Sequence, residues 1–306
     1  MRHFITIAET TPADLRHMLD VARRLKQEHR ASGHNKPILE GKTLAMIFEK
    51  PSLRTRVSFT IAMNHLGGSA MMLRQEEVGI DTREPVRDVA RVLSGMVDGI
   101  MARTFSHDRV VDLARWSEVP VINGLTDLGH PCQAMADLMT IEEHFGSLGG
   151  RTIAFIGDGN NVARSLAVAC GKFDMRFILA SPSAYRIPEA DIDRMMSQVP
   201  DMDFVTMDDP MEAAREADVI YTDTWVSMGQ EDEKQQRLAD FSAYQVNAHL
   251  LAAAKPQAIV LHCLPAYRGR EISDDVIEGP RSMVFPQSRN RLHFQKGLVA
   301  VLLAGV

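Results

Sequence analysis

The sequence predicts an α/β protein with two doubly wound parallel-sheet domains joined by helices, and a C-terminal helix that returns to the N-terminal domain. Segments with strand character alternate with helical ones, which is typical of parallel sheets covered on both faces. This alternation occurs twice, on either side of the glycine-containing segment 146–150. The chain of 306 residues also exceeds the length of roughly 250–300 residues at which single cores stop growing. We expect domains at 1–146 and 147–287, with the helix at about 288–306 packing on the first.

The first series of elements opens with a helix whose start is marked by capping residues. Thr10 or Thr11 can cap it, Pro12 suits its first turn, and apolar residues recur from Leu15 at helical spacing. Strands are expected at 42–48, 98–103 and 120–124, and helices near 55–66, 107–116 and 130–146.

The second series begins with a strand, a glycine turn and a helix over 151–173. Further strands are expected at 175–181, 202–207, 217–223 and 257–265, and the last helix at 288–306. In such sheets ligands bind beyond the carboxyl ends of the strands, so chemistry is expected in the loops that follow them.

The composition narrows the class of protein. A formal net charge of -6 argues against a general nucleic-acid binder, although it leaves room for a local basic pocket. The three cysteines form no CxxC pair, which argues against a disulfide framework and a structural zinc site. The N-terminus shows no export signal, and the apolar stretch 297–306 is too short to span a bilayer. We therefore expect a cytoplasmic protein that binds neither nucleic acid nor membranes.

The loop at 49–56 joins a strand to a helix and carries groups that suit a phosphate. Ser52 and Thr55 offer hydroxyls, Arg54 offers a guanidinium clamp, and the helix start offers backbone N–H groups. A capped helix with solvated arginines explains the same residues equally well, and Arg56 could be structural.

Two further loops of the first series carry polar groups. Arg103 ends a strand, where a surface arginine is the commoner explanation. Pro131 could hold the backbone so that His130 and Gln133 face one point, with the histidine donating to a carbonyl oxygen and the amide carbonyl of Gln133 accepting from an NH2 group. Local hydrogen bonding is the alternative for a lone histidine at such a junction.

The glycine turn of the second series resembles half of a dinucleotide-binding fingerprint. The sequence Gly157-Asp158-Gly159-Asn160-Asn161 is followed by Val162 where the third glycine would stand, so we expect no nicotinamide cofactor. The two asparagines suggest recognition of a small polar group, although asparagine is also a good turn residue.

The last two strand ends of the second series are also polar. Asp223 offers an acceptor for an ammonium group, and Ser227 with the backbone after it can bind a carboxylate. Cys263 could be a catalytic thiol, but buried free cysteines are usually inert, and the inert interpretation is favoured for this residue alone.

The order of these motifs resembles the aspartate/ornithine carbamoyltransferase family, and its ornithine branch in particular, over essentially the whole chain. The motifs are Ser-x-Arg-Thr-Arg, a strand-end arginine, His-Pro-x-Gln, Asp-x-x-x-Ser-Met-Gly, His-Cys-Leu-Pro and Asn-Arg at 290–291. The N-terminal motifs are shared by both branches and specify carbamoyl phosphate only. The 227–229 and 262–265 motifs are the more specific ones for ornithine.

This resemblance implies that the carbamoyl group of carbamoyl phosphate is transferred to the δ-amino group of L-ornithine, which gives L-citrulline and phosphate in arginine biosynthesis or catabolism. It implies no cofactor and no metal, and a homotrimer or a multiple of trimers with shared active sites. The first domain would bind carbamoyl phosphate and the second ornithine. The catalytic residues would be Arg103, His130 and Cys263.

The resemblance also implies binding roles. Carbamoyl phosphate would be held by Ser52, the backbone N–H of Leu53, Arg54, Thr55, Arg103, His130, Gln133, Cys263, Leu264 and Arg291. Ornithine would be held by Asn161, Asp223, Ser227 and Met228.

Three positions depart from the family pattern. Leu53 replaces a frequent threonine, and Ser288-Arg289 stands where an acidic residue often precedes the Asn-Arg pair. In the loop 75–84, Gly79 occupies the place of a glutamine that reaches the neighbouring subunit's site in the family. The sequence leaves open whether Gln75, Thr82 or Arg83 substitutes for it.

Other functions remain as alternatives at this stage. One is a carbamoyltransferase for a related amine acceptor, and another is a non-catalytic paralogue that binds an anion. The proton of the attacking amine could pass to Cys263 or to the leaving phosphate; we favour phosphate, with Cys263 polarising the amine.

Overall fold

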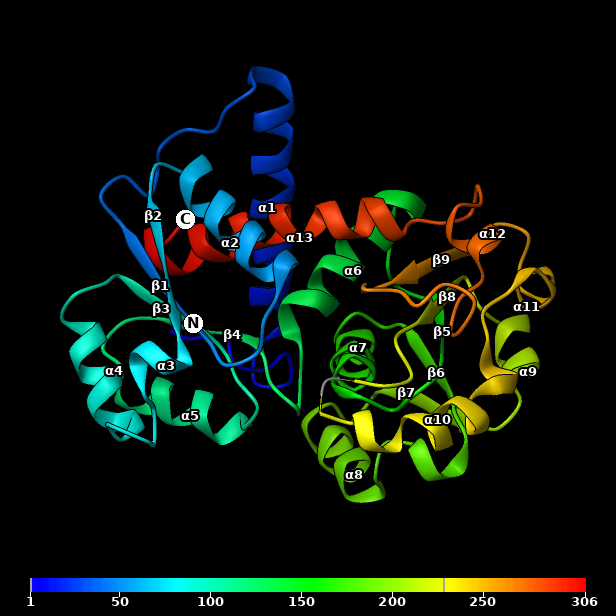
Figure 1. Cartoon of the computed structure of the whole chain (residues 1–306). Helices are drawn as coiled ribbons and strands as arrows, with labels where there is room; N and C mark the ends of the chain where they lie inside the picture. The colour runs from blue at the N-terminus through cyan, green and yellow to red at the C-terminus, as the bar shows by residue number, and fades with distance from the viewer. Residues whose placement is uncertain (1, 228) are drawn as a thin grey trace. The chain divides into compact units, whose positions relative to one another are not determined.

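The computed structural model describes residues 2–227 and 229–306, which form two compact units. Unit 1 comprises Met1–Ala136 and Arg289–Val306, and unit 2 comprises Asp137–Ser288. The chain passes between the units inside two helices, α6 (Pro131–Phe145) and α13 (Val284–Val299) (Figure 1). Helices therefore join the two units, as the fold class predicts.

Unit 1 contains a 4-stranded parallel sheet in the order β2-β1-β3-β4. The strands are β1 (Thr43–Phe48), β2 (Ser69–Arg74), β3 (Gly99–Arg103) and β4 (Val121–Leu125). The helices are α1 (Pro12–Ser32), α2 (Leu53–His65), α3 (Gln75–Val78), α4 (Val86–Ser94) and α5 (His107–Trp116), together with the unit 1 part of α13 and a π-helical turn at Ala300–Ala304.

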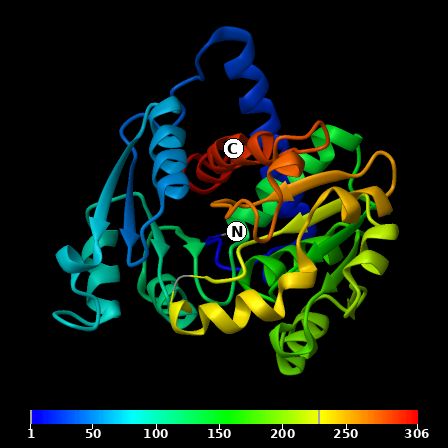
Figure 2. The ribbon, with the colours of Figure 1, turned by 45° about the vertical axis from the view of Figure 1, so that its right-hand side comes forward.

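Apolar residues on both faces of the unit 1 sheet create its core. Ile47 and Ile100 pack with Val89 of α4 and Leu113 of α5 on one face. The π-helical turn and α1 are in contact, and the C-terminal helix lies beside α1 in Figures 1 and 2. A Cβ atom at Gly297 would lie only 2.7 Å from the backbone of α1, so glycine permits this close approach.

Unit 2 contains a 5-stranded parallel sheet in the order β7-β6-β5-β8-β9. The strands are β5 (Thr152–Ile156), β6 (Arg176–Ala180), β7 (Asp203–Met207), β8 (Val219–Thr222) and β9 (Ile259–His262). The helices are α7 (Asn161–Lys172), α8 (Glu189–Gln198), α9 (Pro210–Arg215), α10 (Lys234–Asp240), α11 (Ala248–Ala253) and α12 (Asp274–Ile277), with 3-10 turns at Ser183–Tyr185, Glu231–Glu233 and Ser242–Tyr244.

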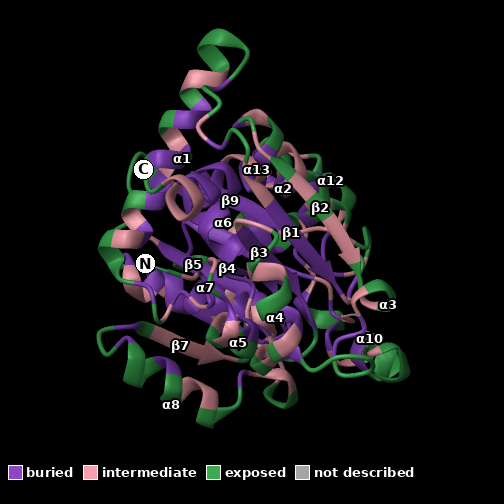
Figure 3. Ribbon diagram, turned by 90° about the vertical axis from the view of Figure 1, so that its left-hand side faces the viewer, coloured by how far each residue is buried: buried purple, intermediate pink, exposed green. Residues whose placement is uncertain are grey.

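The unit 2 sheet is buried on both faces. Ile156, Ile178 and Val260 belong to the apolar cluster on one face, which includes residues of α9, α11 and α12. On the other face, the rings of Phe155 and Tyr221 stack with centroids 5.2 Å apart, because their strands are paired in register. Figure 3 shows the central strands as buried, whereas the edge strands β2 and β7 include half-buried and exposed residues.

The observed elements confirm the predicted fold class. Thr11 caps α1, and α5 spans the predicted residues 107–116. The helix at 288–306 begins earlier, at Val284, and its later part belongs to unit 1 as predicted. The sequence analysis missed β2, whose residues alternate between half-buried and exposed because it forms an edge of the sheet.

In the part of the chain that the structure describes, none of the helices combines the length and apolar character that a membrane span requires. All three cysteines are free thiols; Cys132 and Cys170 are buried, and Cys263 is partly exposed.

Candidate active site

The N-terminus of α2 forms the first part of the candidate site in unit 1. Ser52 is the N-cap, and its side chain accepts a hydrogen bond from the Thr55 N–H at 3.2 Å. The first-turn N–H groups of a helix have no partner within the helix and suit an anion. The Leu53 side chain is 74% exposed, so a ligand at this helix start would meet its backbone N–H rather than its side chain.

Arg291 of α13 joins α2 to α6 inside unit 1. Its guanidinium donates one hydrogen bond to Gln133 Oε1 and another to Thr55 Oγ1 at 3.3 Å. All three side chains are buried, with at most 2% of their surface exposed. Residues distant in sequence thus hold one another in position.

Buried positive charge surrounds His130 at the start of α6. His130 and Arg103 are both buried, and Arg103 ends β3. Burial lowers the pKa of His130 well below its ordinary value, and the positive charges of Arg291, Arg103 and Arg54 lower it further. His130 is therefore neutral at pH 7 and can serve as a hydrogen-bond donor without adding a charge.

Ion pairs fix the loop that leads into α2. The Glu49 N–H donates to the Arg103 carbonyl at 2.9 Å, which continues the β1–β3 pairing beyond the strands. Glu49 also accepts from Arg109, and Lys50 pairs with Asp127. These ion pairs hold the loop against β3 and α5.

In unit 2, a cluster of polar side chains is built around Asp223, at the end of β8. One carboxylate oxygen accepts from the Cys263 thiol at 2.9 Å, and the other accepts from the Asn160 amide at 2.8 Å. Asn160 is also the N-cap of α7, where it accepts from the N–H groups of Val162 and Ala163. Asp223 therefore connects the ends of β5, β8 and β9.

The segment after β9 has an unusual backbone that presents Cys263. Leu264 has a positive φ of 57°, in the left-handed region, and its N–H donates to His262 Nδ1 at 2.9 Å. The other ring nitrogen, Nε2, lies 3.2 Å from a Glu271 oxygen. Because Nδ1 accepts, the neutral ring carries its proton on Nε2 and donates it to Glu271.

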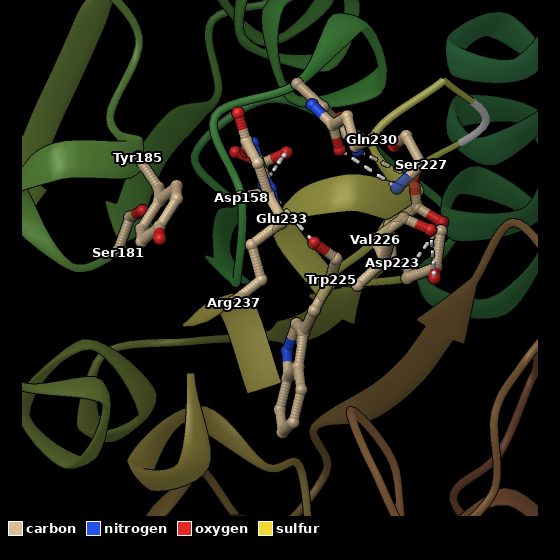
Figure 4. A network of polar contacts seen from close by, with 12 residues as sticks. Asp158, Ser181, Tyr185, Asp223, Trp225, Val226, Ser227, Gln230, Glu233 and Arg237 are labelled. Atoms are coloured by element: carbon tan, nitrogen blue, oxygen red, sulfur yellow. Dashed lines mark hydrogen bonds and ion pairs between the residues drawn. The ribbon is translucent and has the colours of Figure 1, made fainter. Parts of the chain in front are cut away.

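A second polar network in unit 2 lies beside Asp223 (Figure 4). Arg237 pairs with Asp158 at 3.3 Å and with Glu233 at 2.8 Å, and it donates to the Trp225 carbonyl. The pKa of Asp158 is raised to about 6, chiefly because the carboxyl group is buried and also by the charge of Asp223, while Arg237 opposes this shift. The Ser227 N–H donates to the Gln230 side chain at 2.9 Å, which orders the loop after β8.

Asp223, His262 and Cys263 are the described residues whose potential metal-ligand atoms come closest together, within 4.8 Å of one another. Both ring nitrogens of His262 have protein partners, and the Cys263 thiol donates to Asp223. We therefore assign this cluster to hydrogen bonding. That the protein uses no metal and no cofactor stays a prediction.

The structure places the predicted residues in two groups. Ser52, Leu53, Arg54, Thr55, Arg103, His130, Gln133 and Arg291 lie in unit 1, and Asn161, Asp223, Ser227, Cys263 and Leu264 lie in unit 2. Met228 lies outside the described residues. The roles of all these residues stay predictions, as do the domain boundaries at 146 and 287.

Sequence reasoning missed Asn160, which contacts Asp223 directly, because it favoured the neighbouring Asn161. An available signal was the N-cap position, where an asparagine stands immediately before a helix. Glu271 and Arg237 were also missed, because their partners His262 and Asp158 lie 9 and 79 residues away in sequence.

The irregular loop 75–84 of unit 1 is built around Gly79. Its φ is 67°, and its carbonyl accepts from the N–H groups of residues 82, 83 and 84. A side chain at this position would be strained, because its Cβ would lie 2.9 Å or less from Arg83. The Gln75 amide donates to the Ile80 carbonyl and the Thr82 hydroxyl to the Gly79 carbonyl, so both side chains stabilise the loop itself.

Comparison with known proteins connects this geometry to a family. The family model described as "Aspartate/ornithine carbamoyltransferase, carbamoyl-P binding domain" matches residues 2–143, and its "Asp/Orn binding domain" counterpart matches residues 149–302. The chain belongs to the aspartate/ornithine carbamoyltransferase family. The family predicted from the motifs is therefore confirmed.

Members of this family with known names and structures cover almost the whole chain. An ornithine carbamoyltransferase of Bacillus subtilis is 48% identical over 304 residues, covering 99% of this chain and 94% of the relative. One from Mesorhizobium japonicum is 49% identical, with 98% of each chain covered. The solved ornithine carbamoyltransferase of Pyrococcus furiosus is 45% identical, with a TM-score of 0.95 and coverage of 100% of this chain and 98% of that one.

Proposed function

We propose that the protein transfers the carbamoyl group of carbamoyl phosphate to the δ-amino group of L-ornithine, which yields L-citrulline and phosphate. The observation that carries this proposal is the cluster in unit 1 where the buried Arg103 and Arg291 and the half-buried Arg54 lie near a neutral, buried His130. The names of the relatives, all ornithine carbamoyltransferases, support ornithine as the acceptor.

Unit 1 would bind carbamoyl phosphate. The phosphate would lie at the start of α2, where it accepts from backbone N–H groups and from Arg54 and Arg291. Gln133 would accept from the carbamoyl NH2 through its amide oxygen, and Ser52 and Thr55 would donate hydroxyl hydrogen bonds.

The reaction needs stabilisation of the carbonyl oxygen as the tetrahedral intermediate forms. His130, Arg103 and Thr55 would donate to this oxygen, and removing one such donor typically costs about 10²–10³ in kcat. A neutral His130 suits this role, because the surrounding arginines already supply the positive charge. Arg54 and Arg291 would then stabilise the departing phosphate.

Unit 2 would bind ornithine. Asp223 would accept from the α-ammonium group, while Asn161, Ser227 and Met228 would contact the amino-acid end of the substrate. Cys263 and Leu264 would lie beside the carbamoyl group and the attacking amine. The hydrogen bond between Cys263 and Asp223 supports this arrangement, because one carboxylate then positions both the thiol and the substrate.

The attacking δ-amine must lose a proton. Its pKa is near that of lysine, about 10.4, so freeing it at pH 7 costs about 4–5 kcal/mol. We propose that the proton passes to the leaving phosphate oxygen within the tetrahedral intermediate, and that Cys263 polarises the amine. The C–O bond to phosphate breaks as the C–N bond remains, so the products balance as citrulline and phosphate.

We further propose a homotrimer, or a multiple of trimers, in the cytoplasm. Apolar side chains on the outer face of unit 1 support assembly: Leu53 and Val57 of α2 and Met71 of the edge strand β2 are 74%, 49% and 52% exposed. Exposed apolar groups beside an unpaired sheet edge are typical of a surface that another chain covers. Sedimentation equilibrium would test this, and a monomer at micromolar concentration would contradict it.

A colorimetric citrulline assay tests the proposed function. We expect product from carbamoyl phosphate and L-ornithine, and far less product when aspartate, putrescine or an acylated ornithine replaces ornithine. Preference for one of these other amines would identify a related carbamoyltransferase. Tight binding of carbamoyl phosphate without turnover of any amine would instead indicate a non-catalytic anion-binding paralogue.

A further inference from the structure

A fully buried side-chain network lies behind Cys263 in unit 2. It consists of Asp137 of α6, Tyr221 of β8 and Gln287 of α13, none of which has any exposed surface. The Gln287 amide donates to Asp137 Oδ1 at 2.7 Å and to the Tyr221 oxygen at 3.1 Å. Tyr221 in turn donates to the other oxygen of Asp137 at 3.0 Å.

Gln287 has a second contact, with the strand that carries the thiol. Its amide oxygen accepts from the His262 backbone N–H at 2.9 Å, one residue before Cys263. The orientation of the amide is determined, because a carboxylate can only accept and a backbone N–H can only donate. Asp137 therefore selects the amide orientation that directs the oxygen toward His262.

The geometry of β9 explains why a side chain is needed at this point. β9 is the last strand in the order of the sheet and pairs with β8. On its other side, the Val260 N–H donates to the Arg281 carbonyl and the Val260 carbonyl accepts from Met283. The next N–H on that side belongs to His262, but the chain has by then entered α13, which begins at Val284. The Gln287 amide oxygen continues the pairing in place of a backbone carbonyl.

We propose that Gln287, oriented by Asp137 and Tyr221, is a positioning residue for the Cys263-Leu264 segment. It fixes the last residue of β9, and the His262 ring in turn accepts from the Leu264 N–H. The thiol can then reach Asp223 at 2.9 Å. The expected effect of Gln287 on turnover rests on the proposed function.

Moving the carboxylate from residue 137 to residue 287 distinguishes a positioning role of Gln287 from a role in packing alone. Gln287→Glu places two carboxylates side by side in the buried network. Adding Asp137→Asn leaves one amide donor and one carboxylate there, so the double variant has the same net charge as the original protein. We expect Gln287→Glu to lower kcat about 10- to 100-fold, the range expected from misplacement of reacting groups by up to about 1 Å. The KM for carbamoyl phosphate should stay within about threefold, because Gln133 and Arg291 keep their bond in unit 1.

The rate at which iodoacetamide alkylates Cys263 gives a readout that does not depend on turnover. Burial raises the pKa of Cys132 to about 12, and burial raises the pKa of Cys170 as well, so these two thiols should stay unreactive. We expect Gln287→Glu to accelerate alkylation of Cys263 severalfold, since the thiol is then no longer held against Asp223. The added Asp137→Asn should restore both the alkylation rate and kcat to within about threefold of the original values.

The chain offers a matched control on its surface. Gln236 donates to Asp240, which also accepts from the Tyr185 hydroxyl, so the same three residue types form the same kind of network. Gln236→Glu should leave kcat and Cys263 alkylation within about twofold, because its hydrogen bonds to Asp240 are exposed to solvent.

Two results would overturn the positioning role. One is a folded Gln287→Glu variant with unchanged kcat and alkylation; the other is a double variant that regains its melting temperature but neither kcat nor the alkylation rate.

Should Gln287→Glu fail to fold, Tyr221→Phe weakens the network without adding charge and keeps the ring stacked on Phe155. It should lower kcat and accelerate alkylation by about threefold or more, and no change in either would reject the proposal. If the original protein makes no citrulline, the proposed function fails, while alkylation still decides the positioning role.

Discussion

The candidate residues of the two units differ in charge. In unit 1, arginines gather around a neutral histidine, and the first turn of α2 adds backbone N–H groups. In unit 2, the carboxylate of Asp223 binds a thiol and an amide, and Arg237 pairs with the acidic residues Asp158 and Glu233. The first arrangement suits a small dianion and the second an amino acid with positively charged amines. The contrast indicates that charge selects the substrate for each unit.

The largest effect that we expect is the pH dependence of ornithine use. Since His130 stays neutral and the δ-amine has a pKa of about 10.4, kcat/KM for ornithine should rise about tenfold per pH unit from pH 6 to 9. Steady-state rates across this range measure the slope. A flat profile while chemistry limits the rate would show that the free amine is not the reacting species.

Removing one arginine from unit 1 tests the role of the positive charge in that unit. Arg54→Ala should lower kcat/KM for carbamoyl phosphate by about 10²–10³, because a charge-assisted hydrogen bond to the phosphate is lost. Arg56→Ala, an exposed arginine on the same helix, is the control and should change it by less than about threefold. Calorimetric binding of carbamoyl phosphate checks both, and near-normal affinity of Arg54→Ala would remove this residue from the site.

Removing the Cys263 thiol tests the role of the polar cluster in unit 2. Cys263→Ala should lower kcat by about 10- to 100-fold with little loss of stability, because Cys263 is only partly buried. Cys170→Ala should show the reverse pattern: about 1 kcal/mol less stability and nearly full activity, because that thiol is packed in the core. Urea unfolding and citrulline formation measure the two quantities. Unfolding of Cys263→Ala would show that this thiol, too, is only structural.

The smallest expected effect concerns acidic groups in unit 2. The pKa of Asp158 is raised from 3.8 to about 6, so the folded chain holds this proton more tightly than the unfolded chain does. The contribution of Asp158 to stability is thus most favourable at low pH and is lost as the pH rises to about 6. Relative to Asp158→Asn, the original protein should gain up to about 1.4 kcal/mol of stability per pH unit as the pH falls from 6 to 4. Paired urea titrations at several pH values would detect this, and a constant difference would contradict the raised pKa.

Much of the fold could be predicted because its determinants are local. The apolar runs of β1 and β5 and the capping residues of α1 and α2 each specify an element within a few residues. β2 was not predicted although residues 70–73 are all apolar, because so short an apolar run does not distinguish a strand from part of a helix.

By itself, the sequence determined which chemical groups stand at the ends of the strands. A strand followed by Ser52-Leu53-Arg54-Thr55, and one ending in Arg103, predict an anion site, although local capping and solvated arginines would explain the same residues. Only the tertiary structure decided that Asn160 bonds to Asp223, that Arg291 bonds to Thr55, and that Gln287 completes the edge of β9. These contacts join residues 25 to 236 positions apart, and they arise because buried polar groups must find partners wherever the folded chain brings them together.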